Sequence, residues 1–172
     1  QCNIKFEIIV IDDCSTLNII NNQKLNTLPH TQYIKLNNNI GRSKIRNLLA
    51  DKAIYPYLLF MDCDAEVIDE HFITNYISQL NSDVVCGGLC HADMLPSPEV
   101  SLRYAYEKRA DKRRAACYRE QEPYERFTPF NFVIRREIFQ SIRFDERITE
   151  YGHEDTLFGI ALKEKSVTIN HI

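Results

Sequence analysis

Two short apolar runs that end in acidic residues constrain the fold of this chain more than any other feature. Residues 6–11 read FEIIVI and precede Asp12 and Asp13, while residues 57–61 read YLLFM and precede the tripeptide DCD at 62–64. Continuous apolar runs of this length suit strands that are buried on both faces, as in parallel sheets. Because ligands of such sheets bind beyond the carboxyl ends of the strands, both acidic clusters are candidate sites.

The rest of the chain alternates between strand and helix patterns. Further strands are expected at residues 33–36, 83–88, 132–134 and 167–169, and helices at 43–53, 69–80, 99–117, 136–142 and 154–163. The first of these helices is expected to turn Ile45, Leu48 and Leu49 inward. Strands that alternate with helices predict an α/β sandwich with a mostly parallel sheet.

Composition excludes some functions and leaves others open. The net charge of −3 argues against a general nucleic-acid binder. The basic run at 103–119 is either a solvated helix face or a patch that faces an anionic ligand or lipid headgroup, as in a protein peripheral to the inner face of a membrane. Six scattered cysteines without a CxxC pair indicate reduced thiols. With no apolar run of about 20 residues and no signal peptide, a cytoplasmic protein is expected.

Asp62 and Asp64 are the candidate metal ligands. Residues two apart in extended backbone project to the same side, so their carboxylates would lie together. Such a pair suits magnesium or manganese and leaves positions for water and phosphate oxygens. Asp12 and Asp13 could similarly accept hydrogen bonds from a ribose hydroxyl or a base N–H. For each pair the alternative is a polar turn at the end of a strand.

Glu154 and Asp155 begin a predicted helix. Acidic residues in a first helical turn are favoured by the helix dipole, which alone would explain them. The functional alternative is a general base placed where a helix enters the site. Residues 118–129 are expected to form a loop, and residues 118–131 could line a site in which Tyr124, Phe127 or Phe130 either contact a ligand or pack into the core.

Together these motifs resemble family 2 glycosyltransferases, which have the GT-A fold. The resemblance rests on FEIIVIDDCST, NNNIGRSKIRN, YLLFMDCDAE, FNFVIRREIF, FDERITEYGHEDTLFGIAL and the closing INHI, and it covers nearly the whole chain. It implies a three-layer α/β sandwich of the nucleotide-diphospho-sugar transferase type, formed by residues 1–172 as one domain.

The resemblance also implies roles for the first half of the chain. Asp12 and Asp13 would meet the nucleoside, with Asp13 as the contact to the base or ribose. Asp62 and Asp64 match the family's DxD motif, in which Asp62 faces the nucleotide sugar and Asp64 is the more direct ligand of Mg²⁺ or Mn²⁺. The remaining residues expected beside the nucleotide are Gly41, Arg42, Arg46 and Asn47.

In the second half, Glu154 and Asp155 match the family's ED motif. Asp155 would be the catalytic base and Glu154 an acceptor contact or helper. His171 lies where some relatives place a further metal ligand, although a histidine after a strand is more often structural.

The implied reaction is an inverting transfer of a sugar from a nucleotide-diphosphate donor, by default a UDP-sugar, to a saccharide or lipid-linked acceptor. A sugar-nucleotide pyrophosphorylase is an alternative, but it would need a glycine-rich and basic loop after its first strand. A nucleotide-binding remnant without activity is another.

One departure from the family concerns the start of the chain. Family members begin with a strand reading like IPVYN well before the DD pair, whereas only eleven residues precede Asp12 here. We therefore expect a domain truncated at its N-terminus. An uncovered sheet edge of this kind is also a site for homodimer formation through strand pairing.

Overall fold

A computed structural model describes residues 4–91, 97–149 and 152–172 of the chain. Its contacts divide into two compact units. Unit 1 comprises Gln1–Leu58 and Arg135–Ala161, and unit 2 comprises Leu59–Ile134 and Leu162–Ile172. Each unit is therefore assembled from two separate stretches of sequence, and the expectation of a single domain stays a prediction.

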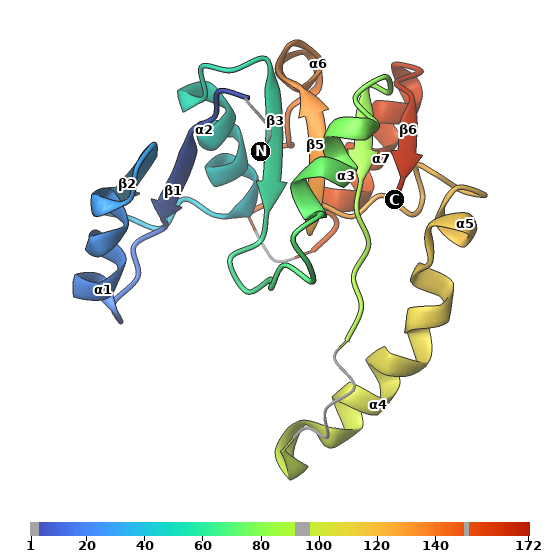
Figure 1. The fold of residues 1–172 in the computed structure, drawn as a ribbon, viewed down its shortest axis with the longest axis horizontal. Helices are drawn as coiled ribbons and strands as arrows, with labels where there is room; N and C mark the ends of the chain where they lie inside the picture. The colour runs from blue at the N-terminus through green and yellow to red at the C-terminus, as the bar shows by residue number, and fades with distance from the viewer. Residues whose placement is uncertain (1–3, 92–96, 150–151) are drawn as a thin grey trace. The chain divides into compact units, whose positions relative to one another are not determined.

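Strands and helices alternate along the chain (Figure 1). The strands are β1 (Ile8–Asp12), β2 (Thr31–Lys35), β3 (Tyr57–Met61), β4 (Val84–Cys86), β5 (Asn131–Arg135) and β6 (Ile169–His171). The α-helices are α1 (Ile19–Gln23), α2 (Arg42–Lys52), α3 (Phe72–Ser78), α4 (Ser101–Ala110), α5 (Ala116–Arg119), α6 (Arg136–Ile142) and α7 (Glu154–Glu164). Short 3-10 helices are η1 (Lys24–Thr27), η2 (Pro98–Val100) and η3 (Asp111–Arg114).

Unit 1 contains a two-stranded parallel sheet in which β1 pairs with β2. Its aromatic core lies between α6 and α7, where Phe139 and Phe158 are almost fully buried. Phe144 stacks on Phe158 with ring centroids 4.2 Å apart. Among the strands that the structure describes, β1 pairs only with β2, so its second edge carries unpaired backbone groups.

Unit 2 is built on a four-stranded sheet in the order β3-β5-β4-β6. Strand β4 runs parallel to β6 and antiparallel to β5. The hydrogen bonds Asp62 N to Phe130 O and Arg136 N to Pro56 O show that β3 also runs against β5. Three strands therefore share one direction, and β5 is the exception to the mostly parallel sheet that the sequence predicts.

The core of unit 2 follows from the apolar runs of these strands. All three residues of β4 are fully buried, as are Phe132 and Ile134 of β5. Phe60 stacks on Phe132 with centroids 4.9 Å apart. Gly87 directly follows β4, where a Cβ atom would lie 1.7 Å from Asn131 Oδ1, so only glycine fits there.

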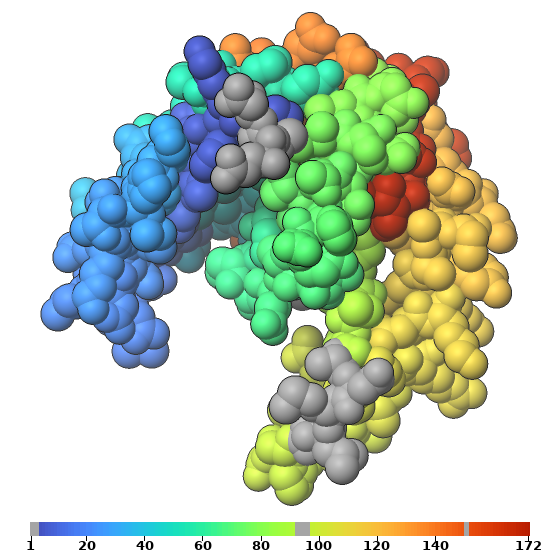
Figure 2. Space-filling view, in the orientation of Figure 1, coloured from blue at the N-terminus to red at the C-terminus, as the bar shows by residue number. Residues whose placement is uncertain are grey.

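The basic run forms an arm of unit 2 rather than one continuous helix. Helix α4 and the turns beside it extend away from the sheet, as the yellow-green to yellow segment shows (Figures 1 and 2). Asp111 ties this arm to His91 in the segment that follows β4, because its carboxylate accepts bonds from the backbone N–H and the ring Nδ1 of His91 at 3.2 and 3.0 Å. Lys108 Nζ donates to His91 O at 2.6 Å.

Several boundaries differ from the prediction. Helix α1 and η1 were not expected, and β6 begins at Ile169 rather than at residue 167. The inner face predicted for α2 was wrong: Ile45, Leu48 and Leu49 are only partly buried. The side chains that α2 buries are Ser43, Arg46, Asn47 and Ala50. Two polar members of this set have partners inside unit 1: Arg46 pairs with Glu154, and Asn47 bonds to Phe144 and Glu146.

No helix within residues 4–91, 97–149 and 152–172 has the length and apolar character needed to cross a membrane.

Candidate functional site

Asp12, the last residue of β1, is buried and held on both carboxylate oxygens. Tyr33 Oη donates to Oδ2 at 2.6 Å, and the Ser15 backbone N–H donates to Oδ1 at 2.7 Å. The Tyr33 hydrogen bond is the main reason that the pKa of Asp12 falls to about 2. Asp12 is thus an anion, and its carboxylate holds the turn that follows β1. Its predicted contact with a nucleoside stays a prediction.

Asp13 lies half-buried beside the start of α2. Its Oδ1 accepts the Ile40 N–H at 2.7 Å and its Oδ2 accepts the Gly41 N–H at 3.0 Å. Gly41 has φ +85°, a conformation that glycine adopts without strain. Because a carboxylate offers about four lone pairs, two accepted bonds leave Asp13 able to bind a ligand hydroxyl or N–H. The geometry thus unites Asp13 and Gly41, which are far apart in sequence.

Arg46 and Glu154 form a buried ion pair in unit 1. Arg46 Nη1 lies 3.3 Å from Glu154 Oε1, and the two side chains are only 8% and 7% exposed. Arg42, half exposed, reaches the same oxygen at 3.9 Å. The Arg46 guanidinium also stands 5.2 Å from the centre of the Phe144 ring. Glu154 is therefore paired with Arg46 and lies near Arg42, and the predicted position of both arginines beside a nucleotide stays a prediction.

Asn47 has a different set of partners. Its Nδ2 donates to Phe144 O at 3.0 Å and to Glu146 Oε1 at 2.8 Å, and its Oδ1 accepts the Phe144 N–H at 3.0 Å. Asn47 is 1% exposed, so these bonds fasten α2 to the segment after α6. The predicted position of Asn47 beside a nucleotide stays a prediction.

Asp155 follows Glu154 in α7 but is more open. Its Oδ1 accepts the Thr156 N–H at 2.7 Å, while Oδ2 has no partner in the part of the chain that the structure describes. Helix α7 is entered through Gly152 and His153, both with positive φ. Two adjacent carboxylates in one helical turn therefore differ: Glu154 is paired and buried, and Asp155 keeps a free oxygen.

Asp62 and Asp64 lie in unit 2, directly after β3. The Ala65 N–H donates to Asp62 O at 3.2 Å, which closes a turn over these residues. The expected extended backbone was therefore wrong here, because β3 already ends at Met61. Asp62 is half-buried and Asp64 is exposed. Two hard oxygen donors on a turn fit a magnesium or manganese ion that completes its shell with water and phosphate oxygens.

His171, at the end of β6, is buried and uses both ring nitrogens. Arg119 Nη1 lies 2.6 Å from Nδ1, and Nε2 lies 3.0 Å from Pro123 O. Since arginine can only donate, Nδ1 accepts and Nε2 carries the proton. Burial lowers the pKa of His171, which favours this neutral form. Its predicted role as a metal ligand stays a prediction, and it would require the ring to give up one of these bonds.

The described residues contain no cluster of three or more histidine, cysteine, aspartate or glutamate side chains arranged to hold a metal ion. Five cysteines of the described chain are free thiols, and Cys2 lies outside the described residues.

The model of glycosyl transferase family 2 matches residues 1–143. The chain belongs to this family. The matched range contains every predicted site residue from Asp12 to Asp64, whereas Glu154, Asp155 and His171 lie beyond it. A search of curated proteins gave no match.

Several solved structures share the fold of this chain. TarS 1–349 from S. aureus matches with a TM-score of 0.66 and 20% identity, over 97% of this chain and 48% of that one. The same protein in complex with UDP matches with a TM-score of 0.63 and 22% identity, over 97% of this chain and 48% of that one. The mannosyltransferase PcManGT from Pyrobaculum calidifontis, in complex with GDP-Man and Mn²⁺, matches with a TM-score of 0.64 and 13% identity, over 96% and 45%.

These likenesses confirm the α/β GT-A fold that the sequence resemblance implied. The chain spans less than half the length of these three structures.

Sequence reasoning missed two residues that organise the sites. Tyr33 looked like an ordinary strand residue, yet it is the partner that holds Asp12 as an anion. Arg119 was expected on a solvated helix face or in a patch facing an anionic ligand, yet it is 5% exposed and contacts His171. Neither role has a local sequence signal, because both depend on partners more than twenty residues away.

Proposed function

We propose that this chain provides donor-binding and catalytic groups of an inverting, metal-dependent glycosyltransferase. The donor is a nucleotide-diphosphate sugar, with a UDP-sugar as the first choice, and the acceptor is a saccharide or a lipid-linked saccharide. The observation that carries the proposal is the difference between two adjacent carboxylates in α7: Glu154 is buried and paired with Arg46, whereas Asp155 Oδ2 has no partner among the described residues. Membership of glycosyl transferase family 2 supports the same reaction class.

Asp155 is the base in this proposal. Its carboxylate takes the proton of an acceptor hydroxyl while that oxygen forms a bond to the anomeric carbon. The bond from that carbon to the donor diphosphate breaks in the same step, so the configuration inverts. Glu154 serves as a positioning residue, because its ion pair with Arg46 fixes the first turn of α7.

The base assignment is tested with Asp155→Asn in the complete protein. We expect transfer to fall by about three orders of magnitude or more, since general base catalysis contributes roughly 10²–10⁴-fold and the Asn amide cannot accept the proton. Binding of UDP should stay within twofold, which separates loss of the base from loss of the fold. Transfer at near the parent rate would refute the assignment.

Asp62 and Asp64 hold the divalent cation in this proposal, with Asp64 as the more direct ligand. A bound magnesium or manganese ion would stabilise the negative charge that develops on the diphosphate leaving group. The Mn²⁺ in the mannosyltransferase complex supports a divalent cation for proteins of this fold. Asp62 and Asp64 supply the hard oxygen donors that such ions prefer.

The metal assignment is tested by calorimetric titration of UDP in the presence of manganese. Asp64→Ala should weaken this binding by at least tenfold, and the difference should vanish when EDTA replaces manganese. Asp69→Ala, which removes an acidic group from the same loop, is the matched control. Equal affinities for the Asp64 variant and the parent would count against the metal role.

Donor binding is assigned to Asp13 and the start of α2. Asp13 would accept a hydrogen bond from the base or ribose, with Gly41 and Arg42 beside the nucleotide. The UDP in the TarS complex supports a uridine donor for proteins of this fold. A thermal-shift screen of UDP, GDP and a nucleoside triphosphate tests the choice, because stabilisation by the triphosphate alone would instead indicate a pyrophosphorylase.

Two further expectations remain part of the proposal. The free edge of β1 supports a homodimer formed by strand pairing. Light scattering tests this, since a monomer at all concentrations would exclude it. The free thiols of the described cysteines support a reducing, cytoplasmic location.

A further inference from the structure

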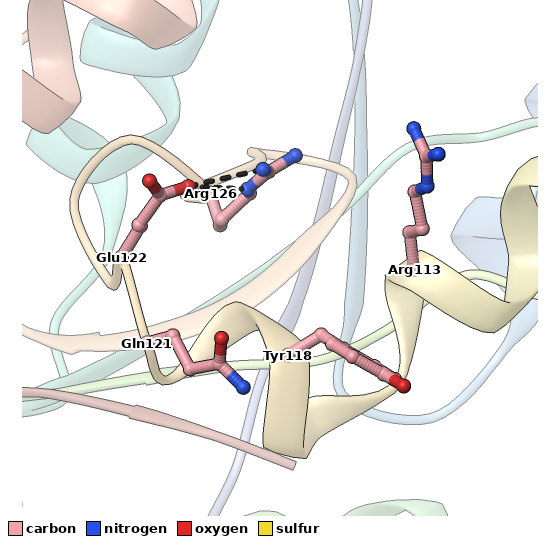
Figure 3. Close-up of a pocket in the computed structure, with 5 residues that line it drawn as sticks. All are labelled: Arg113, Tyr118, Gln121, Glu122 and Arg126. Atoms are coloured by element: carbon pink, nitrogen blue, oxygen red, sulfur yellow. Dashed lines mark hydrogen bonds and ion pairs between the residues drawn. The ribbon is translucent and has the colours of Figure 1, made fainter.

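Unit 2 carries a hollow that none of the acidic motifs lines. It encloses about 480 Å³ between Arg113, Tyr118, Gln121, Glu122 and Arg126. These side chains come from η3, α5 and the turns that follow, and they surround an open space (Figure 3). The volume lies in the range of small-molecule sites.

Arg113 gives the hollow a positive charge that has no direct partner among the described residues. Arg126 donates through Nε and Nη2 to Glu122 Oε2 at 3.1 and 3.0 Å, so these two charges offset each other. Arg113 makes no hydrogen bond or ion pair with any described residue. The hollow is therefore lined by the unpaired Arg113 guanidinium together with the Glu122–Arg126 ion pair.

The surrounding segment strengthens this field. Residues 103–126, which include all the lining side chains, contain eight arginines and lysines and five acidic residues, in a chain whose net charge is −3. Four of the five acidic residues form ion pairs: Glu107 with Arg114, Asp111 with Lys108 and Arg114, Glu122 with Arg126, and Glu125 with Lys163. A local excess of one sign attracts ligands of the opposite sign.

The remaining side chains fit a sugar ring. Tyr118 is 54% exposed, and its ring offers a flat face to the apolar side of a sugar. Gln121 Nε2 donates to Cys117 O at 3.3 Å, which leaves the amide oxygen open to a hydroxyl. Glu122 Oε1 and Arg126 Nη1 lie at the other side, so the rim offers both acceptors and donors.

The other aromatic side chains of this segment are occupied. Tyr124 Oη donates to Val167 O at 3.1 Å, and Lys163 Nζ lies over its ring at 6.0 Å. Phe127 is 4% exposed and packs edge-on against Phe132. Phe127 therefore packs into the core and Tyr124 is held by its hydroxyl, whereas Tyr118 is an exposed ring that lines the hollow.

The backbone under the hollow is held in place before any ligand binds. Buried Arg119, next to Tyr118, donates to Arg114 O at 2.8 Å, to Cys86 O at 3.1 Å and to Ile172 O at 2.6 Å. These bonds fasten the end of η3 and α5 to strand β4 and the residue that follows β6. A site on a fixed backbone loses less conformational entropy on binding.

We propose that this hollow binds a saccharide that carries a carboxylate or phosphate group. Arg113 takes the acidic group, Tyr118 contacts the sugar face, and Gln121 with the Glu122–Arg126 pair binds hydroxyls. The inference goes beyond the proposed transferase function, because it adds a binding site for acidic saccharides that none of the acidic motifs lines.

Binding to four probes tests the inference without any donor present. Tri-galacturonate and glucose 6-phosphate carry the two acidic groups, and galactotriose and glucose are their neutral counterparts. The parent should bind at least one acidic probe about tenfold or more tightly than its neutral counterpart in NMR titration, and the preference should weaken at high salt. The stronger acidic probe identifies carboxylate or phosphate as the preferred group.

Three variants locate the binding. Arg113→Gln should weaken binding of the acidic probe about tenfold and leave binding of the neutral probe unchanged, since only the charged contact is lost. Tyr118→Ala should weaken the binding of both probes. Arg109→Gln is the matched control, because Arg109 is also exposed and unpaired among the described residues but does not line the hollow.

Three results would overturn the inference: no binding of either acidic probe, equal binding of acidic and neutral probes, or equal losses in the Arg109 and Arg113 variants. UDP and GDP, each with manganese, are titrated into the same samples. Retained nucleotide binding with no saccharide binding refutes only the saccharide site, whereas a parent that binds neither nucleotide contradicts the proposed function. Far-UV circular dichroism confirms that each variant is folded.

Discussion

The Arg46–Glu154 pair allows a quantitative test of how unit 1 holds the start of α7. Both side chains are nearly inaccessible and their charges lie 3.3 Å apart. Removing one partner of a buried pair costs about 3–5 kcal/mol, because the other charge stays in the protein without its counterion. Arg42 lies 3.9 Å from the same oxygen and is half exposed, so it can partly neutralise Glu154. We therefore expect Arg46→Met to cost about 3 kcal/mol, the lower end of that range.

Glu154→Gln is the reciprocal change. Arg46 then keeps its contact with the Phe144 ring, so a loss of about 2–3 kcal/mol is expected, somewhat below the buried-pair range. The double variant removes both charges and should lose less than the two single losses combined. The coupling free energy should be about 2 kcal/mol, within the range for residues in direct contact.

Urea denaturation followed by far-UV circular dichroism measures these values, since the chain has no tryptophan to report by fluorescence. Asp51→Asn is the control, because it breaks the two-bond pair with Arg143 at 35% and 47% exposure. An exposed pair of this kind is worth about 1 kcal/mol or less. A coupling below about 0.5 kcal/mol, the limit of ordinary additivity, would show that the Arg46–Glu154 pair does not hold α7.

Two further predictions concern stability. Gly87→Ala should lower the free energy of unfolding in urea by about 3 kcal/mol or more, above the middle of the range for overpacking. The added Cβ would lie 1.7 Å from Asn131 Oδ1 and 2.0 Å from Tyr76 Oη. A loss under about 1 kcal/mol would mean that both side chains can move away. Tyr33→Phe should remove the main cause of the low pKa of Asp12. Since that pKa is about 2 in the folded chain and 3.8 ordinarily, Asp12 stabilises the fold above pH 4 and loses this effect as the pH falls toward 2. The variant should lose stability at pH 7 and show a flatter pH dependence between pH 4 and 2, and parallel curves for parent and variant would contradict the assignment.

The sequence predicted best where a local pattern decided the structure. Strand β3 and helix α6 have the predicted bounds, because an apolar run and a helical period each leave few alternatives. The turn after β1 and the turn after β3 were likewise found from the acidic residues that end each strand. Helix α1 was missed because its sequence, IINNQ, buries no side chain and therefore has no apolar period to detect.

The site was less predictable because its contacts join distant segments. Asp13 was expected to contact a ligand, but nothing in the sequence indicated that its carboxylate would also hold the loop before α2. Arg46 and Glu154 are 108 residues apart, and no local rule pairs them. The apolar pattern of α2 was correctly read as helical, yet the direction of its buried side depended on those distant partners.

Arg119 gives unit 2 a property that matters for how its ligand preference can change. The buried Arg119 guanidinium donates to main-chain oxygens of three segments, so these bonds do not depend on which side chains those segments carry. Side chains at the rim of the hollow can therefore be substituted one at a time, while the backbone beneath them keeps its conformation. If the hollow binds a saccharide as proposed, its preference can therefore change through surface substitutions alone.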